Sequence, residues 1–196
     1  MQKIIKKKVG KNNKYFYVGK QYHSKEEIYF NWFCNDLKKT GHIKYIIYQP
    51  ETLTLIDKPK YYWRKRNVKS ITEKTGNIID SLAYTPDFQI TWSKKGIEQY
   101  VYILNEENMS IRSRARKPFV AIRDKDYPLD SLVSYIDVKG SFGRHGDAVK
   151  FSLLQKIILY TKGIFVEKIV PEKLFKKTFY PERYIYTDGL TKKRKI

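Results

Sequence analysis

Two aspartates and a lysine are the side chains of this sequence best suited to carry out chemistry together. Asp87 follows Pro86, and Asp137 and Lys139 lie two positions apart at the end of the apolar run 132–138. Residues two apart on a strand point to the same face, so Asp137 and Lys139 can share a pocket that Asp87 joins from a neighbouring strand. Carboxylates are ligands that Mg²⁺ or Mn²⁺ prefers, and a lysine beside them can position a water and stabilise developing negative charge. The set therefore predicts metal-assisted hydrolysis of a phosphate ester.

Two helices are expected to flank the strands that carry these residues. Ser24-Lys25-Glu26-Glu27 reads as a capping box, in which Ser24 and Glu27 satisfy each other's backbone donors, and the helix should end near Lys39 before Thr40-Gly41. The second helix is expected over roughly 148–161, capped by Asp147 and ended by Gly163.

Alternating or bounded apolar runs predict the strands, and polar stretches rich in turn residues predict the connections. The expected strands are 15–22 (with a turn at Gly19-Lys20), Ile43–Tyr48, Thr52–Ile56, Ser81–Thr91, Tyr100–Leu104, Leu132–Val138 and Ile164–Ile169. The expected connections are a loop or hairpin arm at 57–80, a turn at 92–96, a flexible connector at 143–146, and a short helix with loops at 172–190. This order predicts an α/β fold with a mixed central sheet flanked by helices.

The charge balance points to a polyanionic partner. Lysine and arginine number 40 against 20 aspartate and glutamate, which leaves a net charge of +20, and DNA or RNA is the first candidate. Aromatic residues are interleaved with the cations, as in Tyr61-Tyr62-Trp63-Arg64-Lys65-Arg66, where rings can stack on bases. The competing explanation is a lysine-rich proteome encoded by an AT-rich genome, with tyrosines that simply pack. The candidate nucleic-acid contacts are Arg64, Lys65, Arg66, Arg112, Arg114, Arg116, Lys117, Arg144 and Lys150.

Cysteine content and hydropathy exclude several other classes of protein. Cys34 is the single cysteine, so neither an internal disulfide nor a Cys/His zinc site can be built, and its apolar neighbours predict a buried thiol. No apolar run approaches the length of a membrane span, and no secretory signal follows the basic start of the sequence. We expect a cytoplasmic protein with no membrane partner.

The ordered motifs resemble a known nuclease superfamily. Pro86-Asp87 followed by Asp137-Val138-Lys139 resembles the PD-(D/E)xK motif, and Ser24-Lys25-Glu26-Glu27 resembles the helix opening of phage Holliday junction resolvase-like and TnsA-like endonucleases. The stretch Tyr48–Leu53 and the closing helix and strand, 148–161 and 164–169, follow in the same order. The resemblance covers roughly residues 15–170.

This resemblance implies a restriction-endonuclease-like αβββαβ core and a Mg²⁺- or Mn²⁺-dependent DNA endonuclease. Asp87, Asp137, the Val138 carbonyl and Glu27 would hold one or two metal ions, and Lys139 would be the positioning lysine. The implied products are a 5′-phosphate and a 3′-hydroxyl. A phage-encoded, junction-resolving enzyme acting in a bacterial host is favoured, and a homodimer is expected because cutting two strands takes two sites.

The sequence departs from the family pattern at several points. Asp87 and Asp137 are 50 positions apart, so either 94–130 is an insertion or another acid replaces Asp87. The candidates for that replacement are Asp80, Glu98 and Asp130. Asp137 stands where many relatives carry glutamate, Glu26 is the fallback for Glu27, and Gln155 does not complete the Gln-xxx-Tyr element of some relatives. The whole is expected to be one nuclease domain, 1–196, with a basic and mobile N-terminal arm (1–14) and a basic tail (191–196).

Structural roles are the alternative for each of these residues. Asp87 could form a turn, Asp137 and Lys139 a surface ion pair, and Glu27 only the helix cap. Lys150 and Gln155 could touch phosphate or the metal site or simply lie on a solvated helix face. His145 could contact DNA from its Gly-rich loop or be a plain loop residue. On the same fold, the chain could therefore be a non-catalytic nucleic-acid-binding protein or a virion-associated protein.

Overall fold

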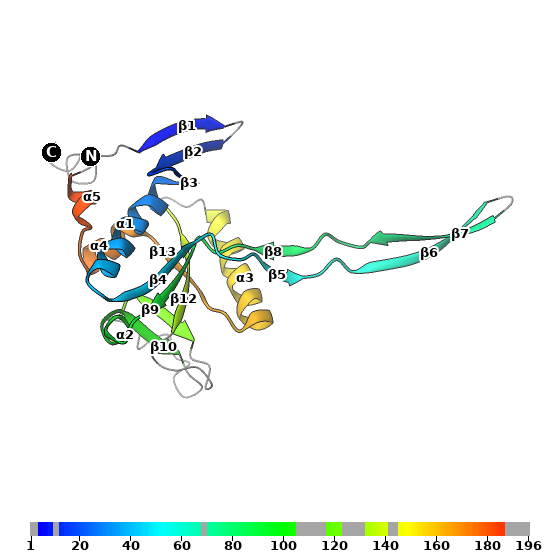
Figure 1. Ribbon diagram of the computed structural model, residues 1–196. Helices are drawn as coiled ribbons and strands as arrows, with labels where there is room; N and C mark the ends of the chain where they lie inside the picture. The colour runs from blue at the N-terminus through cyan, green and yellow to red at the C-terminus, as the bar shows by residue number, and fades with distance from the viewer. Residues whose placement is uncertain are drawn as a thin grey trace.

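A computed structural model describes residues 4–9, 12–67, 70–104, 117–122, 132–140 and 145–186 (Figure 1). Its centre is a four-stranded mixed sheet in the order β13-β12-β9-β4. These strands are β4 (Ile43–Tyr48), β9 (Phe88–Trp92), β12 (Val133–Val138) and β13 (Val166–Ile169). β9 runs antiparallel to both β4 and β12, whereas β12 and β13 are parallel. The expectation of an α/β protein with a mixed sheet is confirmed.

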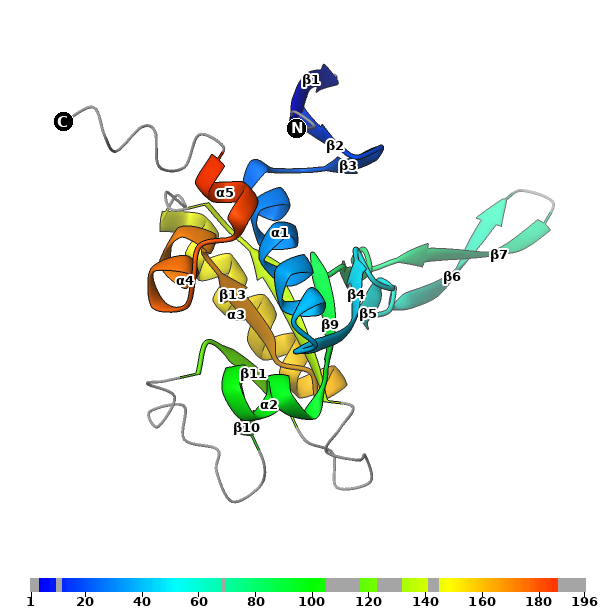
Figure 2. The ribbon, with the colours of Figure 1, turned by 60° about the vertical axis from the view of Figure 1, so that its left-hand side comes forward.

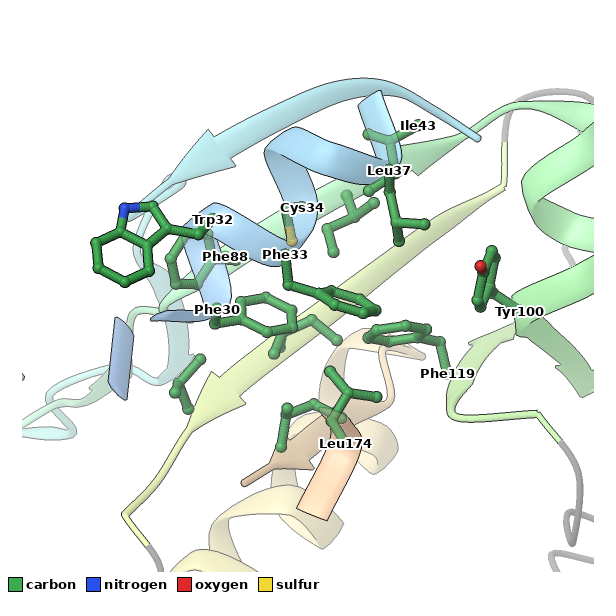
Figure 3. Close-up of a cluster of buried hydrophobic side chains, with 14 of the residues drawn as sticks. Phe30, Trp32, Phe33, Cys34, Leu37, Ile43, Phe88, Tyr100, Phe119 and Leu174 are labelled. Atoms are coloured by element: carbon green, nitrogen blue, oxygen red, sulfur yellow. The ribbon is translucent and has the colours of Figure 1, made fainter. Parts of the chain in front are cut away.

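Helix α1 (Lys25–Lys39) covers one face of this sheet. Its buried residues Ile28, Phe30, Phe33 and Leu37 recur at helical spacing, so one stripe of the helix faces the sheet. Figure 3 shows this stripe meeting side chains of the sheet and of α4. The cluster is largely aromatic: the Phe30 ring lies 5.0 Å from Phe88 and 6.3 Å from Phe119. Cys34 is fully buried among them, as expected, and burial raises the pKa of its thiol well above the usual value.

Helix α3 (His145–Lys162) packs on the other face, against β13 and the short strand β5 (Leu53–Ile56) (Figure 2). Ile158 is fully buried there with Val166 and Leu55, and Tyr135 of β12 packs against them. Because Tyr135 and Asp137 have the same parity on β12, the aspartate belongs to this α3 face, while Ile136 belongs to the α1 core.

A long hairpin interrupts the chain between β4 and β9. Its stem pairs β5 with β8 (Leu82–Tyr84), and its outer part is the antiparallel ribbon of β6 (Lys60–Asn67) and β7 (Ser70–Asn77). The expected hairpin arm at 57–80 is confirmed and extends far from the body (Figure 1). The single strand expected over 81–91 is wrong. It breaks at 85–87, because Pro86 has no N–H for a ladder and the two halves pair with different strands, β5 and β4.

The remaining elements surround the sheet. The N-terminal segment forms a three-stranded antiparallel sheet of β1 (Ile5–Val9), β2 (Asn12–Tyr17) and β3 (Lys20–Tyr22), where the sequence suggested an arm without structure up to residue 14. Between β9 and β12 lie α2 (Lys94–Tyr100) and the parallel pair β10 (Val101–Leu104) and β11 (Phe119–Ile122). Two short helices, α4 (Pro171–Lys177) and α5 (Glu182–Tyr186), close the described chain beside α1.

Two helix starts differ from the expectation. Ser93 caps α2 by accepting a hydrogen bond from the backbone of Gly96, so the expected turn at 92–96 is the beginning of a helix. Helix α3 begins at His145, which places Asp147 inside its first turn rather than at its cap. A short polar stretch can begin a helix as readily as it forms a turn, because Ser and Asp side chains can hydrogen-bond to nearby backbone N–H groups in both. The ends at Thr40 and Gly163 are as expected, and Gly163 has the positive φ of 64° typical of a helix end.

Among the described helices, none is both long and apolar enough to cross a membrane.

Candidate active site

Asp87 lies where the chain leaves the hairpin stem and enters the central sheet. Its Oδ2 accepts a hydrogen bond of 2.7 Å from the backbone N–H of Val138, at the end of the neighbouring strand β12. Its own carbonyl oxygen accepts a hydrogen bond of 2.8 Å from the backbone of Gln49, just beyond β4. Backbone groups next to two strands therefore hold this residue in place.

Asp137 lies directly across from Asp87. In the β9–β12 register, Ile136 is paired with Phe88, so the next position on each antiparallel strand brings the two aspartates together at one end of the sheet. The side chain of Asp137 is only 5% exposed, and its Oδ1 accepts a hydrogen bond of 3.1 Å from the Tyr84 hydroxyl. The 50 positions between them include β9, α2, β10 and β11, and Asp87 still lies beside Asp137.

The side chain of Lys139 contacts that of Asp137. Its Nζ lies 2.9 Å from Asp137 Oδ2, and its side chain is 43% exposed, so Lys139 is partly open to solvent whereas Asp137 is buried. The same-face prediction for these two residues is confirmed. Burial lowers the pKa of Lys139, but the hydrogen bond to Asp137 and the charges of Asp137, Asp87 and Glu27 outweigh it and leave the pKa raised. The lysine is therefore a cation at neutral pH, suited to holding anions or water rather than to removing a proton.

Glu27 contributes the third carboxylate, from the first turn of α1. Its Oε1 accepts a hydrogen bond of 3.0 Å from the Ser24 hydroxyl, and the Glu27 backbone donates to that hydroxyl, which confirms the Ser24 half of the expected capping box. In the other half, the Glu27 carboxylate meets the backbone N–H of His23 instead of that of Ser24. Its Oε2 accepts from the backbone N–H of His23 at 3.0 Å and from the Tyr48 hydroxyl at 2.7 Å. Glu27 is 3% exposed, so this network fixes its position.

The crowding of carboxylates is visible in the pKa of Asp87. The pKa of Asp87 is raised to about 7, first by burial and then by the nearby charges of Asp137 and Glu27, against the opposing effects of the Val138 N–H and Lys139. Burial and neighbouring carboxylates also raise the pKa of Tyr84 and of Tyr48, so both phenols stay protonated and donate to their carboxylates. Three acidic groups with one lysine make a site with an excess of negative charge.

The donor set fits a hard divalent cation. No group of three or more His, Cys, Asp or Glu side chains within the described ranges is arranged to hold an ion on its own. Mg²⁺, however, keeps several waters and is commonly bound by one or two carboxylates together with the substrate phosphate. Asp87 and Asp137 supply two, and a cation between them would relieve the repulsion that raises the pKa of Asp87. Both oxygens of Glu27 already accept hydrogen bonds, which favours contact through a water.

Glu26 lies near Gly140, at the segment that follows the cluster. A Cβ built on Gly140 would lie 3.5 Å from Glu26 Oε1, so this carboxylate borders the segment that follows Lys139. Glu26 is partly exposed, in contrast to Glu27.

The other candidate residues within the described ranges are exposed or have structural contacts of their own. Arg64, Lys65 and Arg66 are exposed on the β6–β7 ribbon, and Lys150 is exposed on α3. Lys117 donates to the Ile97 carbonyl, and Gln155 donates to the Val166 carbonyl at 2.6 Å, so both have structural contacts. Asp80 is exposed beside Lys58, and Glu98 is exposed on α2. Arg112, Arg114, Arg116, Asp130, Arg144, the basic tail 191–196 and the side chain of His145 lie outside the described residues.

Sequence reasoning missed the two tyrosines. Tyr48 and Tyr84 each donate to one carboxylate, and both come from strands that precede a turn into the site. With 17 tyrosines in the chain, no local pattern distinguishes these two, since only the pairing of β5 with β8 and of β4 with β9 brings them to the acids.

A hollow of about 560 Å³ lies elsewhere, between α1, the β2–β3 turn and α5. It is lined by residues such as Tyr17, Trp32 and Arg183, and by none of the three clustered acids.

Comparison with known proteins finds no matching family model, curated protein or solved structure.

Proposed function

We propose that the chain is a metal-dependent endonuclease that hydrolyses phosphodiester bonds of DNA at the Asp87–Asp137–Lys139 cluster. The observation that carries this proposal is the meeting of two buried or half-buried aspartates from adjacent strands with a cationic lysine on the same face. The net charge of +20 makes a polyanion the natural substrate.

The arrangement of elements supports the finer fold assignment. In chain order, α1, β4, β9, β12, α3 and β13 follow the αβββαβ pattern, with the hairpin arm inserted after β4 and the α2–β10–β11 unit inserted after β9. Asp87 then directly precedes the second strand of that core, Asp137 lies on the third and Glu27 lies on the first helix, as the resemblance to PD-(D/E)xK nucleases implies.

Each residue has a defined task in the proposed reaction. Asp87 and Asp137 bind the cation, whose chemistry when bound is to polarise the scissile phosphate and acidify a water. Lys139 holds the attacking water or a non-bridging phosphate oxygen and offsets the charge that builds in the transition state. Tyr84 keeps Asp137 oriented, and Tyr48 does the same for Glu27. The raised pKa of Lys139 assigns it positioning and charge stabilisation, not proton removal.

A cleavage assay tests this function. The purified chain is incubated with Mg²⁺ or Mn²⁺ and with two DNA substrates, a four-way junction and a linear duplex of the same sequence. We expect products ending in 5′-phosphate and 3′-hydroxyl, with faster cutting of the junction, as the resemblance to phage junction-resolving enzymes implies.

Asp137→Asn is the matched variant, because it keeps the Tyr84 contact and the shape of the side chain but removes the charge. It should reduce cleavage by a factor on the order of 10³, while DNA binding in EDTA persists. If the wild type cuts no substrate with either metal, the chain is instead a non-catalytic DNA-binding or virion-associated protein. Equal cutting by wild type and variant would show that the site lies elsewhere.

A homodimer in the bacterial cytoplasm remains part of the proposal, since two sites are needed to cut two strands. Sedimentation of the chain with and without a four-way junction measures this directly.

A further inference from the structure

The hairpin arm is anchored at the candidate active site. Its stem ends at Tyr84, whose hydroxyl binds Asp137, and the Thr52 and Thr85 hydroxyls lie 2.7 Å apart across its base. From this base the stem and ribbon run outward as one hairpin (Figure 1). The arm therefore has a fixed origin beside the carboxylates and a direction away from them.

The described side chains of the ribbon do not pack into the protein core. Its described side chains are almost all exposed, including Tyr62 at 74% and Ile71 at 63%. A two-stranded ribbon standing alone in water is marginally stable, so a long one that buries nothing needs another reason to be present. A surface of this kind indicates a partner.

An aromatic stack stiffens the ribbon near its inner end. The Tyr61 and Trp63 rings lie 4.9 Å apart and nearly parallel, at 19°. Gly76 is paired with Tyr61, and a Cβ there would lie 3.0 Å from the Tyr61 ring, so the glycine lets the ring lie across the partner strand. The stack favours an extended, pre-formed ribbon over a flexible loop.

The ribbon is strongly basic. Glu73 is the only acid on the described part of β6 and β7, and its carboxylate lies 3.1 Å from Arg64. The cations along the two strands are Lys60, Arg64, Lys65, Arg66 and Lys74. This charge repels a second copy of the ribbon and attracts a polyanion.

We propose that this arm binds duplex DNA along its length, on one side of the scissile phosphate. The major groove admits a two-stranded β-ribbon, and the cations can then reach the phosphates of its walls. The strand path from Leu53 to Asn67 spans about 50 Å at roughly 3.3 Å per residue. At about 3.4 Å per base pair, the arm covers up to about 15 base pairs. The inference rests on the proposed function for its substrate, but not on catalysis.

Neutralising the ribbon tests the proposal. In the full-length chain, Lys65→Gln, Arg66→Gln and Lys74→Gln are combined, which leaves the aromatic stack and the Arg64–Glu73 pair intact. Binding to a duplex of about 40 base pairs is measured in EDTA across a salt series. We expect affinity to fall by at least about tenfold and the slope of log K against log salt to decrease by about 2 to 3.

The matched control removes the same charge from the body. Lys173, Lys176 and Lys177 are exposed on α4, on the α1 side of the molecule, and are changed to glutamine together. This variant should bind DNA within about twofold of wild type. Equal loss in both triple variants would show that only net charge matters and would overturn the proposal, as would wild-type binding by the ribbon variant. A change in sedimentation without a change in DNA affinity would assign the arm to self-association instead.

Trp63 gives a direct report of contact. It is 39% exposed, whereas Trp32 is 3% exposed and Trp92 is fully buried, so acrylamide quenching of tryptophan emission comes mainly from Trp63. Duplex DNA in EDTA should protect this emission from quenching, and Trp63→Phe should abolish the protected component. Unchanged quenching under saturating DNA would exclude the arm from the interface. Neither readout involves cleavage, so the two proposals can fail separately. Protection of Trp63 by DNA without any cleavage would refute the nuclease proposal alone. Cleavage without protection of Trp63 would refute this inference alone.

Discussion

Among the residues of the site, Glu27 and Glu26 differ in what they do, although they are neighbours in the sequence. Glu27 is buried and accepts three hydrogen bonds, from Ser24, His23 and Tyr48, whereas Glu26 is partly exposed beside Gly140. Glu27, the residue that the capping box identifies, therefore links α1 to Tyr48 at the end of β4.

Glu27→Ala should therefore lower the free energy of unfolding by about 2 kcal/mol, because it removes the cap partner and leaves buried donors without an acceptor. Glu26→Ala should cost about 0.5 kcal/mol, from the lost interaction with the helix dipole. Urea denaturation of both variants at one pH measures the difference. Equal costs would contradict the assigned geometry.

Asp87 makes the stability of the metal-free protein depend on pH. Its folded-state pKa of about 7 lies above the unfolded value of 3.8, so between these pH values the native state holds a proton that the unfolded state has released. Stability should then fall as pH rises from about 4 to about 7. The shift sets an upper limit of about 4 kcal/mol, and we expect roughly half of that after solvent relaxation.

Denaturation in EDTA at pH 5 and pH 8 measures this effect, with Asp87→Asn as the control. The variant keeps an acceptor for the Val138 N–H and should be more stable than wild type at pH 8, yet inactive. Saturating Mg²⁺ should stabilise wild type at pH 8 and leave the variant nearly unchanged. A wild type that gains stability between pH 5 and pH 8 in EDTA would refute the pKa assignment.

At the scale of elements, the α2–β10–β11 insertion docks on the sheet with a close backbone approach at Gly96. A Cβ on Gly96 would overlap the His42 carbonyl oxygen, which also accepts hydrogen bonds from the backbone and hydroxyl of Ser93. The insertion is thereby held against the start of β4, and β11 lies beside β12 through the Ser134–Val120 hydrogen bond of 2.7 Å.

Gly96→Ala should destabilise the protein by about 3 kcal/mol or more, because backbone rather than a flexible side chain must move. Gly163→Ala is the comparison: its φ is 64° with open space around a Cβ, so it should cost only about 1 kcal/mol. Thermal unfolding of both variants checks the order. A smaller loss for Gly96→Ala than for Gly163→Ala would show that α2 does not dock as described.

At the scale of the whole molecule, DNA binding should be separable by experiment from DNA cleavage. The charge of +20 is spread over the chain, whereas the carboxylates occupy one end of the sheet. EDTA should abolish cleavage and leave DNA affinity within a few-fold, and raising salt from about 50 to 200 mM should weaken binding by a factor on the order of 10³. Anisotropy titrations run beside cleavage gels measure both. Cleavage that survives EDTA would rule out the proposed metal site.

Local pattern in the sequence determined several features by itself. The Ser24–Glu27 capping box, the apolar stripe of α1, the strands around Ile43–Tyr48 and Leu132–Val138, and the shared face of Asp137 and Lys139 all follow from spacing, because helical and strand periodicity act within a few residues. The excess of positive charge likewise needs no structure.

Only the tertiary structure determined which residues from distant segments lie opposite one another. The β9–β12 register places Asp87 opposite Asp137 over a gap of 50 positions, and the break at 85–87 sends Tyr84 into a different sheet from Phe88 while its hydroxyl still reaches Asp137. The same assembly raises the pKa of Asp87 and keeps Lys139 a cation. Such pairings depend on contacts between distant segments, and neither the composition nor the period of any one segment carries that information.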